Sequence, residues 1–193
     1  YSDGALANQI GGLSNLIQTN GQGTVGGINA ATWTFWRNQF REMTGTNTAA
    51  APSVANAASM VADMNRLWLS TVRGKDKPDL INMTHDFYSL YELGLQDKQR
   101  YADATLGDAG FETLKYKTAA VVFDDNANFG TTAERGYFLN TDYLYLVQHS
   151  EAQWTADEEK KPVNQDAIVV PMYWMGNMVT TNRALQGILF DAA

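Results

Sequence analysis

The sequence of 193 residues contains no cysteine and only two histidines. Without cysteine, disulfide bridges and thiolate metal sites are excluded, and a cytosolic origin is favoured over a secreted one. The two histidines, His85 and His149, are far apart in the sequence, and neither belongs to an H-x-H or H-E-x-x-H pattern. We therefore interpret both as structural residues and predict no metal site, no cofactor and no catalytic residue.

Basic residues and long apolar runs are also scarce. Fourteen Lys and Arg stand against 21 Asp and Glu, which gives a net charge of −7. Such a chain lacks the basic stripe that displaces counterions from nucleic acid. The longest apolar run, residues 168–175, contains Pro171 and is far shorter than the roughly 20 residues that span a bilayer. No basic and apolar leader opens the sequence, so we predict neither a membrane partner nor direct binding of nucleic acid.

Apolar and aromatic residues are abundant. Hydrophobic residues make up 45% of the chain, including eight Phe, nine Tyr and five Trp. This is enough to bury a core in one domain of ordinary size or in two small subdomains.

The clearest pattern lies between residues 53 and 94, where a helix, a strand and a second helix are predicted. Ser53 is a good N-cap for a helix over 53–72 that Gly74 closes. Residues 80–83 form a short buried strand, Thr84 caps the second helix, and Gly94 ends it. In the first helix the predicted apolar face contains Val54, Ala57, Ala58, Val61, Met64, Trp68 and Val72, and the opposite polar side contains Asn56, Asp63, Asn65 and Arg66.

The second half of the sequence is predicted to consist mainly of strands. Residues 111–125 form two strands with a turn at Lys117 and Thr118, and the apolar residues 120–123 form a central buried strand. Residues 137–139 and 143–147 form a hairpin around a turn at 140–142.

The C-terminal part is predicted to be extended, and the N-terminal part to be largely loop. Residues 151–163 form a charged connection, and residues 167–180 form a long strand with Pro171 and Gly176 at bulge or edge positions. The chain closes with a short turn or helix over 183–190. At the other end, residues 1–32 are glycine-rich loop with a short apolar turn, and residues 32–41 form a strand or an aromatic anchor.

Two short motifs resemble ligand sites but lack essential parts. A G-x-G-x-x-G pattern occupies residues 21–26 without a preceding buried strand, so we do not interpret it as a nucleotide site. The loop 124–130 resembles the start of a calcium loop. Its glycine comes one place late, at Gly130, and the twelfth position is Arg135 instead of a bidentate glutamate. A turn solvated by Asp and Asn side chains is the better interpretation.

Other candidate sites are weaker still. Trp33 and Trp36 could stack on a sugar or a base, but packing in the core or at an interface is the commoner role of such aromatics. No serine lies in a G-x-S-x-G context, and no pair of acids stands in an apolar setting as a glycosidase requires. These observations favour a protein that is not an enzyme.

The order of the motifs resembles that of the major capsid proteins of tailed bacteriophages, which share the Hong Kong phage shell fold with encapsulins. The resemblance covers nearly all of the chain, and each motif alone is weak. The segments that carry it, in order, are IGGLSNLIQ, GGINAATWTFWRN, PDLINMTHDFYSLYELG, LKYKTAAVVFDD, YFLNTDYLYLV and NQDAIVVPMYWMGNMVTTNRALQGIL. In the family they correspond to the segment after a long spine helix, a strand-to-helix unit, a strand pair, a hairpin and a closing strand.

The resemblance implies an α+β fold with a mixed, mainly antiparallel sheet flanked by two helices, plus strands of a peripheral domain. Residues 1–52 would connect the peripheral and axial domains, residues 53–150 would form the axial domain, and residues 151–193 would return to the peripheral domain. The family's N-terminal arm, extended loop and spine helix would precede Tyr1. On this expectation the chain is a fragment and is monomeric in isolation.

The resemblance also implies a structural function. Copies of the chain would assemble into the pentamers and hexamers of an icosahedral head that encloses double-stranded DNA, made in the bacterial cytoplasm and found in the virion. Other copies of the chain are its expected partners, and DNA is a partner only indirectly. The alternative is a soluble ligand- or calcium-binding α+β domain that uses the 124–130 loop, or a small enzyme of unknown reaction.

Overall fold

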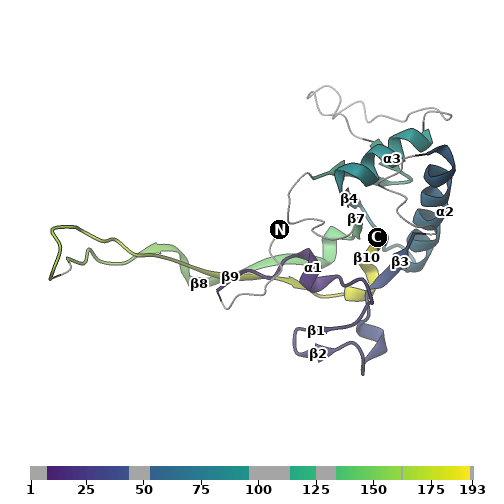
Figure 1. The fold of residues 1–193 in the computed structure, drawn as a ribbon. Helices are drawn as coiled ribbons and strands as arrows, with labels where there is room; N and C mark the ends of the chain where they lie inside the picture. Colours follow the sequence, from purple (N-terminus) through teal and green to yellow (C-terminus); the bar gives the residue numbers. More distant parts are fainter. Residues whose placement is uncertain (1–7, 44–52, 96–113, 125–133, 162, 192–193) are drawn as a thin grey trace.

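The body of the molecule is a six-stranded mixed sheet, and a long two-stranded hairpin extends away from it (Figure 1). The computed structural model describes residues 8–43, 53–95, 114–124, 134–161 and 163–191. The strand order is β3-β10-β7-β4-β6-β5. The strands are β3 (Gln39–Glu42), β4 (Leu80–Met83), β5 (Leu114–Tyr116), β6 (Ala119–Phe123), β7 (Glu134–Leu139) and β10 (Gly187–Asp191). Because β3 pairs with β10 and β4 with β6 in parallel, while the other pairs are antiparallel, the predicted mixed sheet is confirmed.

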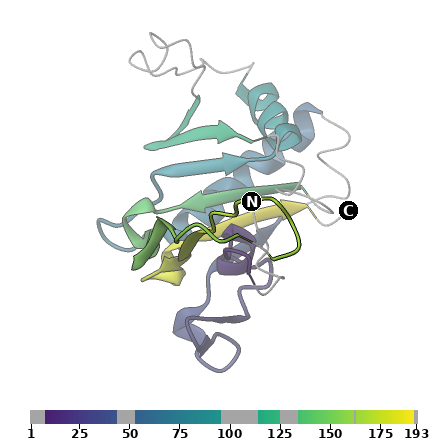
Figure 2. The ribbon, with the colours of Figure 1, turned by 90° about the vertical axis from the view of Figure 1, so that its left-hand side faces the viewer.

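Two helices, α2 (Val54–Thr71) and α3 (His85–Leu95), cover one face of this sheet (Figure 2). The Ser53 hydroxyl accepts a hydrogen bond from the Asn56 amide at 3.2 Å, which confirms the predicted N-cap. The helices touch closely where a Cβ on Gly94 would lie 3.2 Å from the Ala57 Cβ. Fully buried side chains from the helices and strands fill this layer, among them Met60, Met64, Leu67, Ile81, Met83, Phe87, Leu90, Val121, Phe138 and Leu189.

Several predicted details of the helices are wrong. Helix α2 ends at Thr71, and Gly74 instead occupies a tight turn in which Arg73 and Asp76 exchange backbone hydrogen bonds. Helix α3 is described to Leu95, one residue past Gly94, and the missing side chain of Gly94 allows the close contact with Ala57 of α2. Thr84 stands at the N-cap position of α3, where its carbonyl accepts from the Tyr88 amide at 2.9 Å, but its hydroxyl is buried and has no hydrogen-bond partner among the described residues.

Strand β6 is neither central nor wholly buried, which corrects the prediction for residues 120–123. It lies second from the edge, between β4 and β5, and its side chains alternate between the two faces. Val121 is fully buried under the helices, while Val122 is half-buried and Phe123 is exposed. The predicted turn before it is confirmed, with Lys117 at φ 54°.

The other face of the sheet is covered by the N-terminal segment. The short helix α1 (Leu13–Leu16), predicted as an apolar turn, packs with Ile17 against Tyr137 and Ile188 of the sheet. A small hairpin of β1 (Thr24–Val25) and β2 (Ile28–Asn29) and the turn η1 (Thr34–Trp36) follow (Figure 1). Residues 32–41 thus divide into the 3₁₀ turn η1 and the start of edge strand β3, instead of one strand.

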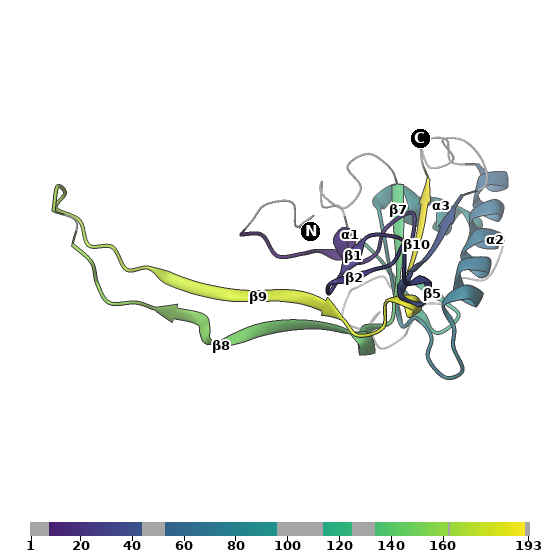
Figure 3. The same ribbon diagram turned by 90° about the horizontal axis from the view of Figure 1, so that it is seen from below.

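Strands β8 (Leu144–Ala156) and β9 (Met172–Thr180) form the long hairpin (Figure 3). The structure corrects two predictions for the hairpin and one for the segment that follows it. Strand β8 pairs with β9 and not with β7, because the 3₁₀ turn η2 (Thr141–Tyr143) redirects the chain out of the body. The first part of the predicted connection 151–163 continues β8. Only the short turn η3 (Arg183–Leu185) is helical in 183–190, and the rest is the inner strand β10.

Candidate functional site

The β8–β9 hairpin exposes more large apolar side chains than any other part that the structure describes. Within the described part of the chain, β8 and β9 pair only with each other, so neither edge of the hairpin has a further strand partner. Near the body, Leu144 and Met178 pack against the core, and farther out most side chains are exposed. Soluble surfaces seldom leave so many apolar groups together unless they are covered by something. The exposed apolar residues along it and its connection are Tyr145, Leu146, Val147, Trp154, Val163, Ile168, Val169, Val170, Met172, Tyr173 and Met175.

A bulge bends the middle of the hairpin. Gln148 pairs with Gly176, after which the register shifts to Gln153 opposite Trp174. A Cβ on Gly176 would lie 2.7 Å from the Val147 carbonyl oxygen, so only glycine fits here. This confirms the predicted bulge position at Gly176. Beyond it, the ring centroids of Trp154 and Trp174 lie 6.4 Å apart.

The root of the hairpin is fixed by a network of polar contacts. The Gln186 side chain accepts a hydrogen bond from the Asn140 amide at 2.9 Å and donates one to the Asn140 carbonyl at 3.0 Å. The Asp79 carboxylate accepts from both the amide and the hydroxyl of Thr141. Since these contacts hold the N-terminal end of η2, they help to set the direction in which β8 leaves the body.

The buried guanidinium of Arg183 ties the N-terminal segment to the strand that follows the hairpin. It donates to the carbonyl oxygens of Leu16 and Gln22, each at 2.6 Å, and to that of Trp36 at 3.5 Å. Burial of this cation lowers the pKa of Arg183. Because its three carbonyl partners lie in different parts of the N-terminal segment, Arg183 holds that segment against the turn η3.

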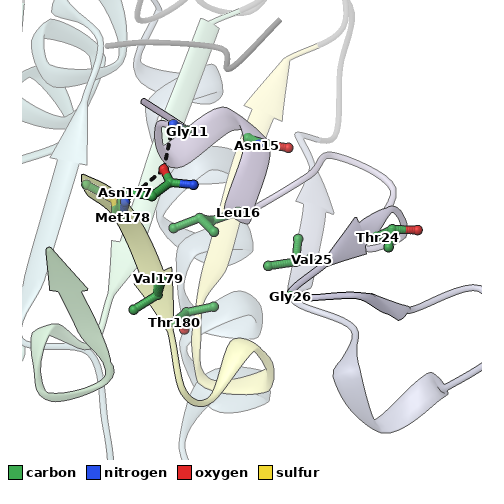
Figure 4. Close-up of a pocket in the computed structure, with 10 residues that line it drawn as sticks. All are labelled: Gly11, Asn15, Leu16, Thr24, Val25, Gly26, Asn177, Met178, Val179 and Thr180. Atoms are coloured by element: carbon green, nitrogen blue, oxygen red, sulfur yellow. Dashed lines mark hydrogen bonds between the residues drawn. The ribbon is translucent and has the colours of Figure 1, made fainter. Parts of the chain in front are cut away.

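A small hollow of about 190 Å³ lies between the hairpin root and the N-terminal segment (Figure 4). The Asn177 side-chain oxygen accepts from the amides of Gly11 at 2.8 Å and Met178 at 2.9 Å. The lining residues are Gly11, Asn15, Leu16, Thr24, Val25, Gly26, Asn177, Met178, Val179 and Thr180. None of these ten described lining residues is ionisable.

The chain was compared with family models, curated proteins and solved structures. No family model matches the chain, and no curated protein matches it. A chain in the solved "Cyanophage A-1(L) capsid asymmetric unit" does match, with a TM-score of 0.51 and 16% sequence identity. The match covers 92% of this chain and 56% of the cyanophage chain, so the chain spans little more than half the length of its structural relative. The chain has the fold of a phage capsid protein.

Among the described residues, those considered for chemistry lie apart from one another. His85 is exposed on α3, 3.3 Å from the Asp86 carboxylate, whereas His149 lies on β8, where its ring accepts from the Glu151 amide. No group of three or more metal-ligating side chains occurs among the described residues. The 124–130 loop lies outside the described residues apart from Asp124.

The structure tests only one half of the prediction that Trp33 and Trp36 pack in the core or at an interface. Trp33 is 56% exposed and contacts the exposed ring of Phe35, so neither belongs to the core of the capsid fold. Trp36 is half-buried, and its indole N–H donates to the Val25 carbonyl at 3.1 Å. An interface role for Trp33 stays a prediction.

No helix in the described ranges has the length and apolar content needed to cross a membrane.

Sequence reasoning also missed polar residues that hold the capsid fold together. Asp63, predicted on the polar side of its helix, is buried and lies 2.9 Å from Arg41 and 3.3 Å from Arg66. The sequence did hold a signal for the contact with Arg66, because a carboxylate and an arginine three residues apart lie on the same side of a helix. The role of Gln186 had no such signal, because its partner Asn140 is distant in sequence.

Proposed function

We propose that this chain is a structural subunit of a bacteriophage head, a major capsid protein whose copies form the pentamers and hexamers of an icosahedral shell around double-stranded DNA. The observation that carries the proposal is the shared fold with the cyanophage capsid chain over 92% of the present chain. Because that likeness is structural at 16% identity, the function is inferred from the fold together with the surface.

The exposed hairpin supports a role in assembly. A ribbon of two strands cannot cover its own faces, and its apolar side chains stand in water in the isolated chain. Burying such residues against other polypeptides stabilises an assembly by about 25 cal/mol for each Å² of apolar surface removed from water. In a shell, the apolar surface that is exposed in the isolated chain would be buried against neighbouring subunits.

The charge of the chain fits a shell wall with a nucleic-acid cargo. A net charge of −7 weakens non-specific attachment to phosphates, so DNA would be enclosed without being tightly held. We further propose the virion as the location of the protein.

The division into residues 1–52, 53–150 and 151–193 as connecting, axial and returning segments stays a prediction.

Labelling of particles tests this function directly. Antibodies raised against the 193-residue chain, and purified on it, should decorate the heads of phage particles from a lysate of the source organism in electron micrographs. Antibody absorbed beforehand with the same chain is the matched control and should give no labelling. A signal confined to soluble material, with unlabelled heads, would contradict the capsid function.

A further inference from the structure

The distal half of the β8–β9 hairpin combines apolar side chains with unpaired negative charge. Beyond the bulge, Trp154, Met172 and Tyr173 are exposed. The ribbon continues to a backbone bridge between Lys160 and Val169. Two ion pairs, Asp157 with Lys160 and Asp166 with Lys161, neutralise the two lysines of this tip. Three carboxylates are left without a side-chain partner in the described ranges, namely Glu151, Glu158 and Glu159.

The C-terminal end of α2 carries the opposite combination. Leu69 is 64% exposed on this helix. The α2–β4 turn that follows, residues 72–79, holds Arg73, Lys75 and Lys77, all exposed. Both of its carboxylates are engaged within the molecule: Asp76 accepts a hydrogen bond from the Tyr143 hydroxyl at 3.0 Å, and Asp79 accepts one from the Thr141 amide at 2.8 Å. Neither Lys75 nor Lys77 has an ion pair or side-chain hydrogen bond with another described residue. With three basic side chains against two carboxylates, this turn is net positive in a chain whose net charge is −7, and it follows the helix end that exposes Leu69.

The two surfaces cannot meet within one molecule. The hairpin points away from the body, and strand β8 alone has 13 residues, about 40 Å at 3.3 Å per residue (Figures 1 and 3). The helix α2 lies on the far side of the sheet from the hairpin tip (Figure 1). Contact between the acidic tip and the basic turn therefore requires two copies of the chain.

We propose that the distal half of the hairpin of one copy docks on the α2–β4 turn of a second copy. Exposed apolar residues around Met172 and Tyr173 would cover Leu69, while Glu158 and Glu159 would face Lys75 and Lys77. This inference rests on the proposed function, since it names the partner and the polarity of a subunit contact. Because tip and turn are different patches, the contact is heterologous and propagates from copy to copy into a ring or a chain of subunits.

Cross-linking tests this contact cleanly, because the chain has no cysteine of its own. Glu158→Cys and Lys77→Cys are prepared as separate proteins, mixed, and oxidised under mild conditions. The mixture should give disulfide-linked dimers several-fold above either variant alone. Glu158→Cys mixed with Ser89→Cys, an exposed position on α3, is the matched control and should stay at background. Raised salt should lower the specific yield, because exposed charges are screened.

Charge reversal supplies the second arm of the test. Adding Lys75→Glu to the Lys77→Cys protein, or Glu159→Lys to the Glu158→Cys protein, should lower the yield, and combining the two should restore it. Yield equal to the Ser89→Cys control would overturn the proposal, as would dimers formed equally by one variant alone. Retention of duplex DNA that Lys75→Glu abolishes, without cross-links, would assign the turn to nucleic acid and also overturn it.

Failure of this contact can be told apart from failure of the capsid function. Labelled phage heads with control-level cross-linking would leave the capsid function in place and remove the tip-to-turn contact. Specific cross-links with unlabelled heads would leave the contact in place and remove the capsid function.

Discussion

Gln186 and Asn140 form a reciprocal pair at the root of the hairpin, in which one side-chain amide satisfies both backbone groups of the other residue at 2.9 and 3.0 Å. Both residues are buried, so water cannot replace either bond. The pair joins the end of β7 to the start of β10 and so holds the point from which β8 leaves the sheet. The direction of the exposed hairpin depends on this contact.

Removing the pair should therefore weaken the whole body. Gln186→Ala leaves the buried Asn140 amide without a partner, while the Asn140 carbonyl keeps the Tyr143 amide at 3.3 Å. We expect the free energy of unfolding to fall by about 1–3 kcal/mol in urea denaturation, the cost of one buried unsatisfied group. Gln153→Ala, which removes an exposed amide from the hairpin, should change it by less than about 0.5 kcal/mol. Equal effects of the two substitutions would contradict the role of the pair.

Strand β6 should respond differently at two neighbouring positions. Val121 is fully buried against the helices, and Val122 points to the other face and is half-buried. Val121→Asp should cost several kcal/mol because an unpaired carboxylate is driven into the core, and Val122→Asp should cost clearly less. Melting temperatures of the two variants measure the difference. A larger loss for Val122→Asp would place the wrong face of β6 in the core.

Stability should decline at alkaline pH because of two buried tyrosines. Burial raises the pKa of Tyr91 and the pKa of Tyr116 to about 12, from an ordinary value of 10.0. Between about pH 10 and 12 the unfolded chain loses these protons and the folded chain keeps them, so the free energy of unfolding falls as pH rises. Tyr116→Phe should make this decline shallower, as measured by urea denaturation at several pH values. An unchanged slope would show that Tyr116 ionises alike in both states.

Removal of divalent ions should leave the protein unchanged. The 124–130 loop lacks the glycine and glutamate spacing of a calcium loop, and His85 and His149 lie on separate elements. Dialysis against EDTA should not alter the melting temperature. A drop of about 5 °C or more that one divalent ion reverses would instead support the ligand-binding alternative.

The 193-residue chain by itself should be a monomer or a weak oligomer at micromolar concentration. Contacts made through one two-stranded ribbon are small and flanked by charge, and interfaces below about 1,200 Å² are usually weak. Light scattering across a concentration series measures this, and cross-linking can still trap the contact. Particles of shell size from this chain alone would show that it carries every contact that a shell needs.

The sequence by itself determined the elements whose signals are local. The cap at Ser53, the helical spacing that follows it, the short strand at Leu80–Met83 and the glycine at the bulge all depend on residues close together in the chain. The capsid fold was implied by the resemblance of the ordered motifs to those of phage capsid proteins, because several weak motifs in the right order are more specific than any one of them.

Only the tertiary structure decided which strands pair and which faces are covered. Residues 144–147 and 137–139 are equally apolar, yet the first leave the body in β8 and the second form an inner strand, because η2 is held by Asp79 and Gln186 from distant segments. In the same way, Asp63 looks like a surface residue in its helix until Arg41 of β3 is placed beside it. Strand pairing and burial depend on contacts between residues far apart in sequence, and local propensity holds no information about those partners.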